Sequence, residues 1–164
     1  MAGGGLPGGA GGGTMSGLRH WFIVRLCQLA IGVLLLASSL AKLGDLPAFA
    51  TQIGHYHLVP LAAVNLMAMT LPWIELVAGL ALVVGVRPRS AAWIALAMML
   101  VFTVAIGTAM ARGLDFECGC FGTADATRVG AVKLLENLLF TALAAVGSLA
   151  PAARRAEAAA QPRA

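Results

Sequence analysis

The chain has 164 residues, of which 60% are hydrophobic and only 11% are charged. Soluble domains carry roughly 25% charged residues, so this composition excludes an ordinary water-soluble domain and favours a lipid bilayer as the main solvent. The formal net charge of +4 comes from Lys and Arg residues scattered at the ends of segments, which gives no indication of a nucleic-acid partner.

Three parts of the chain are distinguished by composition. Residues 1–18 are mostly Gly with Ala and Pro, which predicts a disordered N-terminal tail. Residues 19–151 carry the long apolar segments and are predicted to form a single transmembrane domain. Residues 152–164 are rich in Ala, Arg and Pro and are predicted to form a disordered cytoplasmic tail.

The transmembrane domain contains four apolar segments, at about 21–43, 61–86, 90–111 and 132–150. Each is close to the roughly 20 residues that cross a hydrocarbon core as a helix. The segments are too long and too continuous for the strands of a barrel, and the third has no polar face that a soluble helix would need. We therefore predict an all-α fold, a four-helix transmembrane bundle.

The first segment has a second interpretation as a signal peptide. Arg19 and Arg25 would form its basic part, and Ser39-Leu40-Ala41 resembles a small-residue cleavage site. The apolar stretch is long for a signal peptide, and cleavage would remove a polar face, so a membrane helix is favoured.

That polar face follows three- and four-residue steps, which place its members on one side of a helix. The small or polar side chains on it should point into the bundle, because charges within a membrane face a partner or a cavity. The face consists of Arg25, Gln28, Gly32, Leu35, Ser39 and Lys42. Cys27 lies on the same segment and is expected to be an ordinary buried residue.

Charged and amide side chains also occur in the second and fourth segments. Glu75 is the only charge in the second, and Glu136 and Asn137 begin the fourth. Depth along the helices predicts that Lys42 pairs with Glu136 near the outer end, and that Arg25 is the cation nearest to Glu75. Two interpretations stay open: these residues hold the bundle together, or they line a pocket that binds an electron carrier such as a membrane quinone or relays protons.

The distribution of Lys and Arg predicts the orientation of the helices. Basic residues concentrate at one end, namely Arg19 and Arg25, Arg87 and Arg89, and Arg154, Arg155 and Arg163. The positive-inside rule then places both termini in the cytoplasm of a multi-pass inner (plasma) membrane protein. The loop between the third and fourth segments faces the oxidising outer compartment, where a disulfide can persist or cycle.

This outer loop contains Cys118-Gly119-Cys120-Phe121-Gly122. A disulfide closed over so short a span is strained and labile, and the glycines should leave the sulfurs open to a partner, so a redox-active dithiol is favoured. A structural or lipid-modified pair is the alternative. No metal site is predicted, because neither these cysteines nor His55 and His57 have further ligands nearby. Tyr56 is expected to be an interfacial aromatic residue.

The order and spacing of several motifs resemble the MauE branch of the DoxX-like membrane proteins, from roughly Arg19 to Ala150. The motifs are Arg25, Ser39-Leu40-Ala41-Lys42-Leu43, Tyr56 with Pro60, Leu71-Pro72-Trp73-Ile74-Glu75-Leu76-Val77-Ala78-Gly79, Arg112-Gly113, Cys118-Gly119-Cys120-Phe121-Gly122 and Glu136-Asn137. Ser38-Ser39 departs from the expected Ser-Gly, a change that bears on helix packing.

The resemblance implies a four-helix, DoxX-like integral membrane protein with a redox-associated role. In methylamine utilisation, MauE is thought to act with a thioredoxin-like partner on the disulfides of methylamine dehydrogenase, an exported client. On this chain Cys118 and Cys120 would be the redox pair, and Lys42, Glu75 and Asn137 the family's polar helix positions.

The expected chemistry is thiol–disulfide exchange at the outer face through a mixed disulfide, in either direction. In the oxidising direction, electrons would leave through a carrier held against the face of Lys42 and Glu75. Two other classes stay open. One is a non-enzymatic membrane scaffold that recruits a thioredoxin-like partner, and the other is a small-solute carrier with Lys42 and Glu75 as gate charges.

Overall fold

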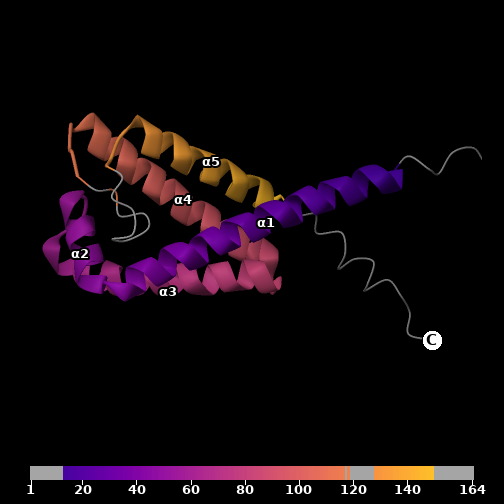
Figure 1. Ribbon diagram of the computed structural model, residues 1–164, viewed down its shortest axis with the longest axis horizontal. Coiled ribbons are helices and arrows are strands. Elements are labelled where there is room, and N and C mark those ends of the chain that lie inside the picture. Colours follow the sequence, from indigo (N-terminus) through magenta and orange to yellow (C-terminus); the bar gives the residue numbers. More distant parts are fainter. Residues whose placement is uncertain (1–12, 117, 119–127, 150–164) are drawn as a thin grey trace, which may run out of the picture.

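The computed structural model describes residues 13–116, 118 and 128–149, and the elements within them are helices (Figure 1). They are α1 (Gly13–Gly44), α2 (Leu46–His55), α3 (Leu61–Val84), α4 (Pro88–Ala111) and α5 (Ala131–Ser148). The four long helices run along the molecule, and α2 lies across one end. The predicted all-α membrane bundle is confirmed.

Each of the four long helices is long and apolar enough to cross a membrane, and the spans have 26, 24, 24 and 18 residues. The helix boundaries lie close to the predicted ones, except that α1 begins at Gly13 within the segment predicted to be a tail. The apolar pattern marks only the part of a helix that lies in lipid, whereas backbone hydrogen bonds can continue the helix beyond it. The first part of α1 extends past the rest of the bundle in Figure 1.

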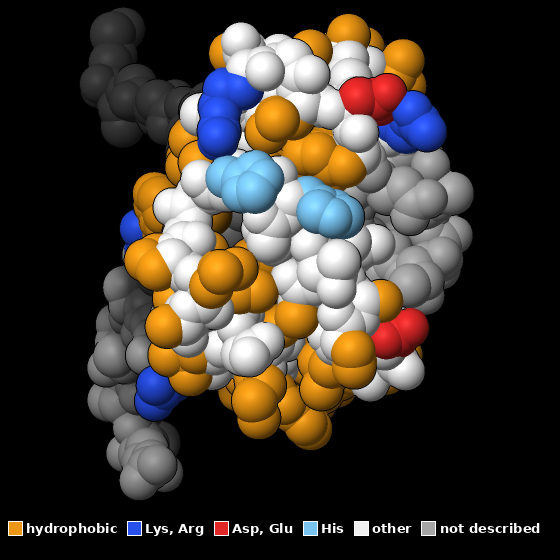
Figure 2. Space-filling view, turned by 90° about the vertical axis from the view of Figure 1, so that its left-hand side faces the viewer, with side chains coloured by type: hydrophobic (Ala, Val, Ile, Leu, Met, Phe, Trp, Pro, Cys, Tyr) orange, Lys and Arg blue, Asp and Glu red, His pale blue; other side chains and the backbone are white. Residues whose placement is uncertain are grey.

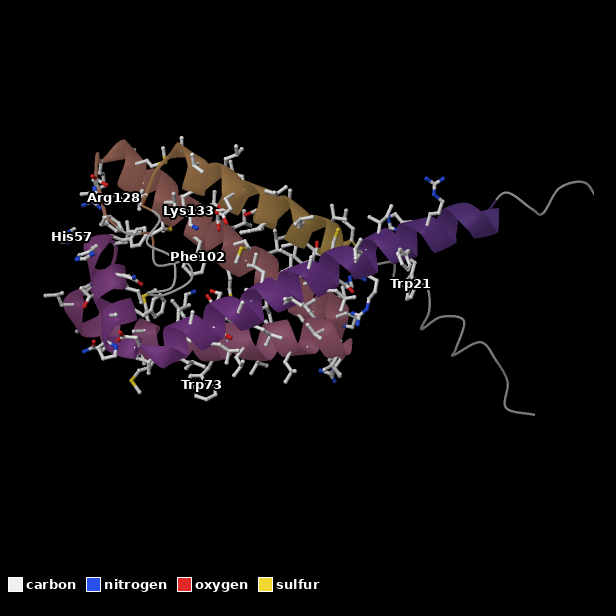
Figure 3. All side chains as sticks on the ribbon, in the orientation of Figure 1. Trp21, His57, Trp73, Phe102, Arg128 and Lys133 are labelled. Atoms are coloured by element: carbon white, nitrogen blue, oxygen red, sulfur yellow. The ribbon has the colours of Figure 1, made fainter. Side chains whose placement is uncertain are left out.

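Side-chain exposure is inverted relative to a protein in water. Large apolar side chains such as Trp21 and Trp73 project away from the bundle, while Lys133 points inward (Figure 3). Several polar side chains are among the buried ones, including Gln28, Ser39, Lys42, Glu75 and Asn137. A surface of exposed Leu, Val, Ile and Trp around a partly polar interior is suited to lipid, because lipid makes no demand for polar groups on the outside.

α2 was not predicted, since the sequence offered only a loop between the first two membrane segments. Asp45 caps its start by accepting a hydrogen bond from the backbone N–H of Ala48 at 3.0 Å. Its side chains Phe49 and Gln52 are buried, and the helix packs against α3. At ten residues, α2 is too short to cross a membrane and instead covers this end of the bundle.

Figure 2 looks onto the end that α2 covers and shows His side chains among polar and apolar groups, with few charges. His55 and His57 are exposed there. His57 has φ = +49°, a left-handed backbone that turns the chain between α2 and α3.

α1 and α3 pack most closely, through glycines on both helices. A Cβ atom on Gly79 would lie 2.9 Å from the carbonyl oxygen of Gly32, nearer than a real Cβ can come. Small residues at this crossing let the two backbones touch, which is the usual way in which membrane helices gain packing energy. The close approach brings the polar face of α1 directly against α3.

The turn between α3 and α4 is short because two residues adopt left-handed backbone angles. Gly85 ends α3 with φ = +85°, and Arg87 has φ = +46° just before Pro88 begins α4. Glycine tolerates this region without steric penalty, and proline suits the first turn of a helix. The turn keeps α3 and α4 antiparallel and adjacent.

Candidate functional site

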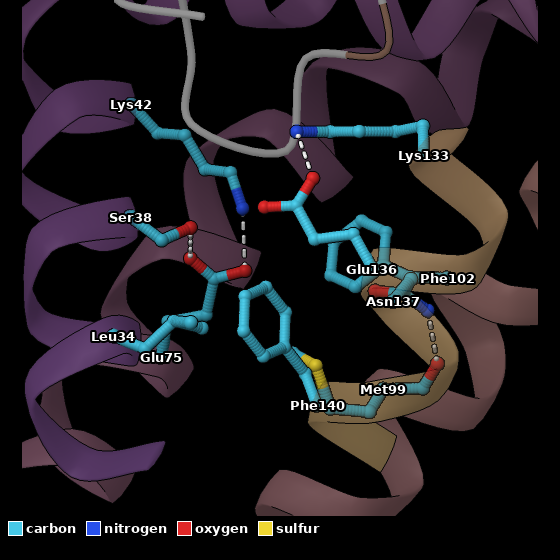
Figure 4. A pocket seen from close by; sticks show the side chains of 10 residues that line it. All are labelled: Leu34, Ser38, Lys42, Glu75, Met99, Phe102, Lys133, Glu136, Asn137 and Phe140. Carbon is cyan, nitrogen blue, oxygen red and sulfur yellow. Dashed lines mark hydrogen bonds and ion pairs between the residues drawn. The ribbon is translucent and has the colours of Figure 1, made fainter. Parts of the chain in front are cut away.

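A buried ion pair joins α1 to α3 near the end of the bundle that α2 covers (Figure 4). Lys42 Nζ lies 2.6 Å from Glu75 Oε1, and Ser38 Oγ donates to the other carboxylate oxygen at 3.1 Å. Both charged side chains are 1% exposed. Each charge is thus removed from lipid and water together with its partner, as buried ions require.

The predicted pairing of Lys42 with Glu136 is therefore wrong, since Lys42 pairs with Glu75. The error came from comparing depths of backbone positions alone. Side chains on a helix lean toward its N-terminus, and α1 and α3 run in opposite directions. Lys42 therefore leans toward the middle of the bundle, and Glu75 leans toward the end that α2 covers. The long lysine stem closes the remaining difference in depth.

Aromatic rings from two other helices complete the surroundings of the Lys42 ammonium group. Its Nζ lies 5.0 Å from the ring centroid of Phe49 on α2 and 4.8 Å from that of Phe102 on α4. A cation over an aromatic face is stabilised by the ring quadrupole, most strongly where water is absent. Neither phenylalanine was predicted, because nothing in the sequence distinguishes these rings from ordinary apolar residues.

A second ion pair lies on α5, opposite the first. Lys133 Nζ is 3.0 Å from Glu136 Oε2, with Lys133 4% exposed and Glu136 40% exposed. Figure 4 shows the two pairs facing each other across a pocket. Lys133 was not among the predicted site residues, although its spacing of three from Glu136 on a helix was a usable signal.

The pocket between the pairs has a volume of about 20 Å³, enough for one water molecule. It is lined by Leu34, Ser38, Lys42, Glu75, Met99, Phe102, Lys133, Glu136, Asn137 and Phe140. Cofactor-sized ligands occupy cavities of roughly 300 Å³ or more, and binding of a quinone at this site stays a prediction. The proton-relay interpretation stays a prediction.

Arg25 and Gln28 lie at the other end of the bundle and do not line this pocket. The Arg25 guanidinium donates to the carbonyls of Leu82 and Val83 at 2.8 and 3.0 Å, and Gln28 Nε2 donates to the Gly147 carbonyl at 2.9 Å. Arg25 therefore caps the C-terminal end of α3, where free carbonyls and the helix dipole favour a cation. The prediction that it is the cation nearest to Glu75 is wrong, because Lys42 occupies that place.

Ser39 and Asn137 make contacts that connect or shape helices. Ser39 Oγ donates to the Leu36 carbonyl of its own helix at 2.9 Å, and it is the neighbouring Ser38 that reaches Glu75. Asn137 Nδ2 donates to Thr103 Oγ1 at 2.7 Å and to the Met99 carbonyl at 3.2 Å, which joins α5 to α4.

Replacing Asn137 with Ala should lower the free energy of unfolding by about 1 kcal/mol, because interhelical hydrogen bonds in membranes contribute amounts of this order. Denaturation in mixed detergent micelles measures the change. Asn65→Ala provides the matched control, since Asn65 is exposed on α3 and its loss should change stability little. Equal effects of the two substitutions would contradict the role given to Asn137.

Cys118 lies at the end of the bundle that α2 covers. Cys118 is 4% exposed, and the Tyr56 hydroxyl donates to its carbonyl oxygen at 2.8 Å and lies 3.4 Å from its Sγ. The expectation of open sulfurs does not hold for Cys118, whose side chain is covered. Cys120 lies outside the described residues. Cys27, on α1, is half-buried and remote in sequence from this loop.

Tyr56 was predicted to be an interfacial aromatic residue, and its contact with the cysteine was missed. The Arg112 guanidinium donates to the Tyr56 carbonyl at 2.9 Å, and the Tyr56 ring meets Phe116 edge-on at 4.7 Å between centroids. Tyr56 and Cys118 are 62 positions apart in the chain, so no local sequence pattern could connect them. Among residues 13–116, 118 and 128–149, no three His, Cys, Asp or Glu side chains gather as around a metal ion.

Four membrane-length helices enclosing a buried ion pair, with a loop cysteine held at one end, define an all-α integral membrane protein. More particularly, the chain belongs to the family described as methylamine utilisation protein MauE, which matches residues 20–150.

Named relatives support this assignment. The chain is 32% identical over 128 residues to the methylamine utilization protein MauE of Paracoccus denitrificans, which covers 77% of this chain and 69% of that protein. It is 30% identical over 118 residues to the protein of the same name from Methylophilus methylotrophus, which covers 71% and 62%. No solved structure matches the chain with significance.

Proposed function

We propose that the chain is a membrane component of a thiol–disulfide system that acts on exported proteins. The names of its relatives suggest methylamine utilisation as the process, with methylamine dehydrogenase as a candidate client. The proposed partner is a thioredoxin-like protein at the outer face of the inner membrane. This proposal makes the chain an oxidoreductase whose reactive groups are Cys118 and Cys120.

The proposed orientation has both termini in the cytoplasm and the cysteine loop outside. The N-terminal end of α1, the α3–α4 turn with Arg87 and Arg89, and the C-terminal end of α5 lie at one end of the bundle (Figure 1). α2 and the chain leading to Cys118 lie at the other. The excess of arginine at the first end supports its cytoplasmic location.

The proposed reaction is exchange between the Cys118–Cys120 disulfide and a dithiol on the partner. A partner thiolate attacks one loop sulfur, a new intermolecular S–S bond forms, and the other loop cysteine leaves as a thiolate. The second partner thiol then resolves the mixed disulfide, so that the partner ends oxidised and the loop pair reduced. Two electrons pass between the proteins, and the reverse sequence is the same exchange run backwards.

The observation that carries this proposal is the contact between Tyr56 and Cys118, the first cysteine of the Cys-Gly-Cys sequence, in a member of the MauE family. The residue is held at the end of the bundle with its sulfur 3.4 Å from a phenol that can donate a hydrogen bond. A thiol becomes reactive when its thiolate is stabilised, so this neighbour supports a chemical role over simple packing.

The redox state of the two loop cysteines in intact cells tests the proposal. A membrane-impermeant maleimide mass tag should label the cysteine loop from outside only after reduction, and one of the Cys118→Ser and Cys120→Ser variants should trap a partner as a mixed disulfide. Cys27→Ser serves as the control, with labelling of the loop unchanged. Loop cysteines that are always reduced and trap nothing would contradict an oxidoreductase role, and labelling only after cell lysis would contradict the orientation.

The burial of Cys118 favours a second candidate, a scaffold that recruits a redox partner without exchanging electrons itself. In that case the Tyr56–Cys118 contact serves to shape a docking loop. Cys120→Ser distinguishes the two candidates, because a scaffold should keep its activity in cells without this thiol whereas an exchange catalyst should lose it.

A further inference from the structure

We propose that Tyr56 is a catalytic hydrogen-bond donor that stabilises Cys118 as the leaving thiolate, so that the partner attacks Cys120. This inference rests on the proposed exchange function and assigns different roles to the two cysteines. The Cys118 side chain is 4% exposed, and this burial keeps the thiol of a partner protein from reaching its sulfur.

The phenol is placed to serve both protonation states of the cysteine. With a neutral thiol, the Tyr56 hydroxyl donates to the Cys118 carbonyl at 2.8 Å, and its oxygen can accept from the S–H group at 3.4 Å. When the sulfur becomes an anion, rotation of the hydroxyl turns the same hydrogen toward it. A hydrogen bond to an ion is about twice as strong as a neutral one, so the phenol favours the thiolate.

Tyr56 is held in this position by contacts that do not involve the cysteine. It directly follows α2, its carbonyl oxygen accepts from Arg112 at 2.9 Å, and its ring packs edge-on against Phe116 with an interplanar angle of 82°. Because the donor is fixed before the reaction, little reorganisation is needed when charge develops on the sulfur.

The partner's thiolate attacks the Cys120 sulfur, a partner–Cys120 disulfide forms, and the Cys118–Cys120 bond breaks with its electron pair on Cys118. A better stabilised leaving thiolate leaves faster. In the next step the partner's second thiolate attacks its own sulfur in the mixed disulfide, and Cys120 is released. Cys118 thus never bonds to the partner.

Among residues 13–116, 118 and 128–149, the other titratable and charged groups near this contact are His55, Arg112, Asp115 and Arg128. His55 packs on Phe116 at 5.6 Å between ring centroids, and Arg112 is engaged with the Tyr56 carbonyl. Asp115 and Arg128 pair with each other at 2.6 Å and are exposed, so water and salt screen them. His55 is therefore the neighbouring group that most needs a control variant.

The test is the rate of iodoacetamide alkylation of Cys118 as a function of pH, in the purified chain carrying Cys27→Ser and Cys120→Ser. The plateau rate at high pH reports access to the sulfur, and the midpoint reports stabilisation of the thiolate. Tyr56→Phe should move the midpoint up by about one pH unit, which corresponds to about tenfold slower alkylation below both midpoints. His55→Phe keeps a ring against Phe116 and should leave the midpoint in place.

Tyr56 is the only tyrosine of the chain, which permits a second and gentler change. Biosynthetic incorporation of 3-fluorotyrosine alters this one phenol, makes it more acidic and thus a stronger donor, and should move the midpoint down. A change confined to the plateau rate in Tyr56→Phe would show that the residue only shapes the loop. A midpoint that follows His55→Phe instead would also overturn the proposal.

Trapping of the partner tests the assigned order of attack. Cys118→Ser should accumulate the mixed disulfide through Cys120, and Cys120→Ser should accumulate none; the reverse result would overturn the assignment. The alkylation experiment tests the role of Tyr56 without a partner protein. The redox state of the loop cysteines in cells tests the exchange function without any assumption about Tyr56. Failure of this inference is thus distinguishable from failure of the exchange function.

Discussion

Replacing Glu75 with Leu should lower the free energy of unfolding by roughly 3–5 kcal/mol, the range found when one partner of a buried ion pair is removed. The Lys42 ammonium group would then lie 1% exposed, with two aromatic rings but without a carboxylate. The double variant Lys42→Met with Glu75→Leu should recover much of this loss, because neither charge is left alone in the interior.

Equilibrium denaturation in mixed detergent micelles measures the free energy of unfolding of Glu75→Leu, Lys42→Met and the double variant. Asp115→Asn supplies the matched control, since Asp115 forms an exposed ion pair with Arg128 and its loss should cost at most about 1 kcal/mol. If the two single substitutions simply added in the double variant, Lys42 and Glu75 would not be coupled, and the pairing would be contradicted.

Gly79→Ala should destabilise the bundle by about 2 kcal/mol, although alanine is the better helix former. The added methyl group would lie 2.9 Å from the Gly32 carbonyl oxygen and 3.1 Å from the Leu36 backbone nitrogen. Backbone atoms cannot turn aside as a flexible side chain can, so α1 and α3 would have to separate.

Gly107→Ala is the matched control for this substitution. Gly107 lies within α4, and a Cβ added there meets nothing within 4 Å. This variant should be unchanged or more stable by up to about 1 kcal/mol, because alanine favours the helix. Thermal unfolding in detergent compares the two, and equal stability of both variants would show that the α1–α3 crossing is not closely packed.

The four long helices were predictable because their signal is local. Runs of about 20 apolar residues have few other solutions in lipid, and the polar residues on α1 already indicated which face lies inward. Lys42, Glu75 and Asn137 were expected to face the bundle interior, since ionisable and amide groups are rare in membrane helices, and all three are buried there.

The partners of these residues were not predictable to the same degree. Which carboxylate meets Lys42 depends on the lean of side chains on antiparallel helices and on the depth at which α1 ends. α2 is too short for a membrane signal, so its cover over Lys42 through Phe49 could not be foreseen. The contact of Tyr56 with Cys118 depends on how three helix ends come together, which a single sequence does not reveal.

The ion pair between α1 and α3 also has a consequence for how the chain is made. Lys42 precedes Glu75 by 33 residues, so α1 is synthesised before the carboxylate that neutralises it. A lysine near a helix end can meanwhile extend its ammonium group to the membrane surface. We therefore expect α1 to reach its final depth only after α3 has entered the bilayer, because the buried position of the Lys42 ammonium group requires the Glu75 carboxylate.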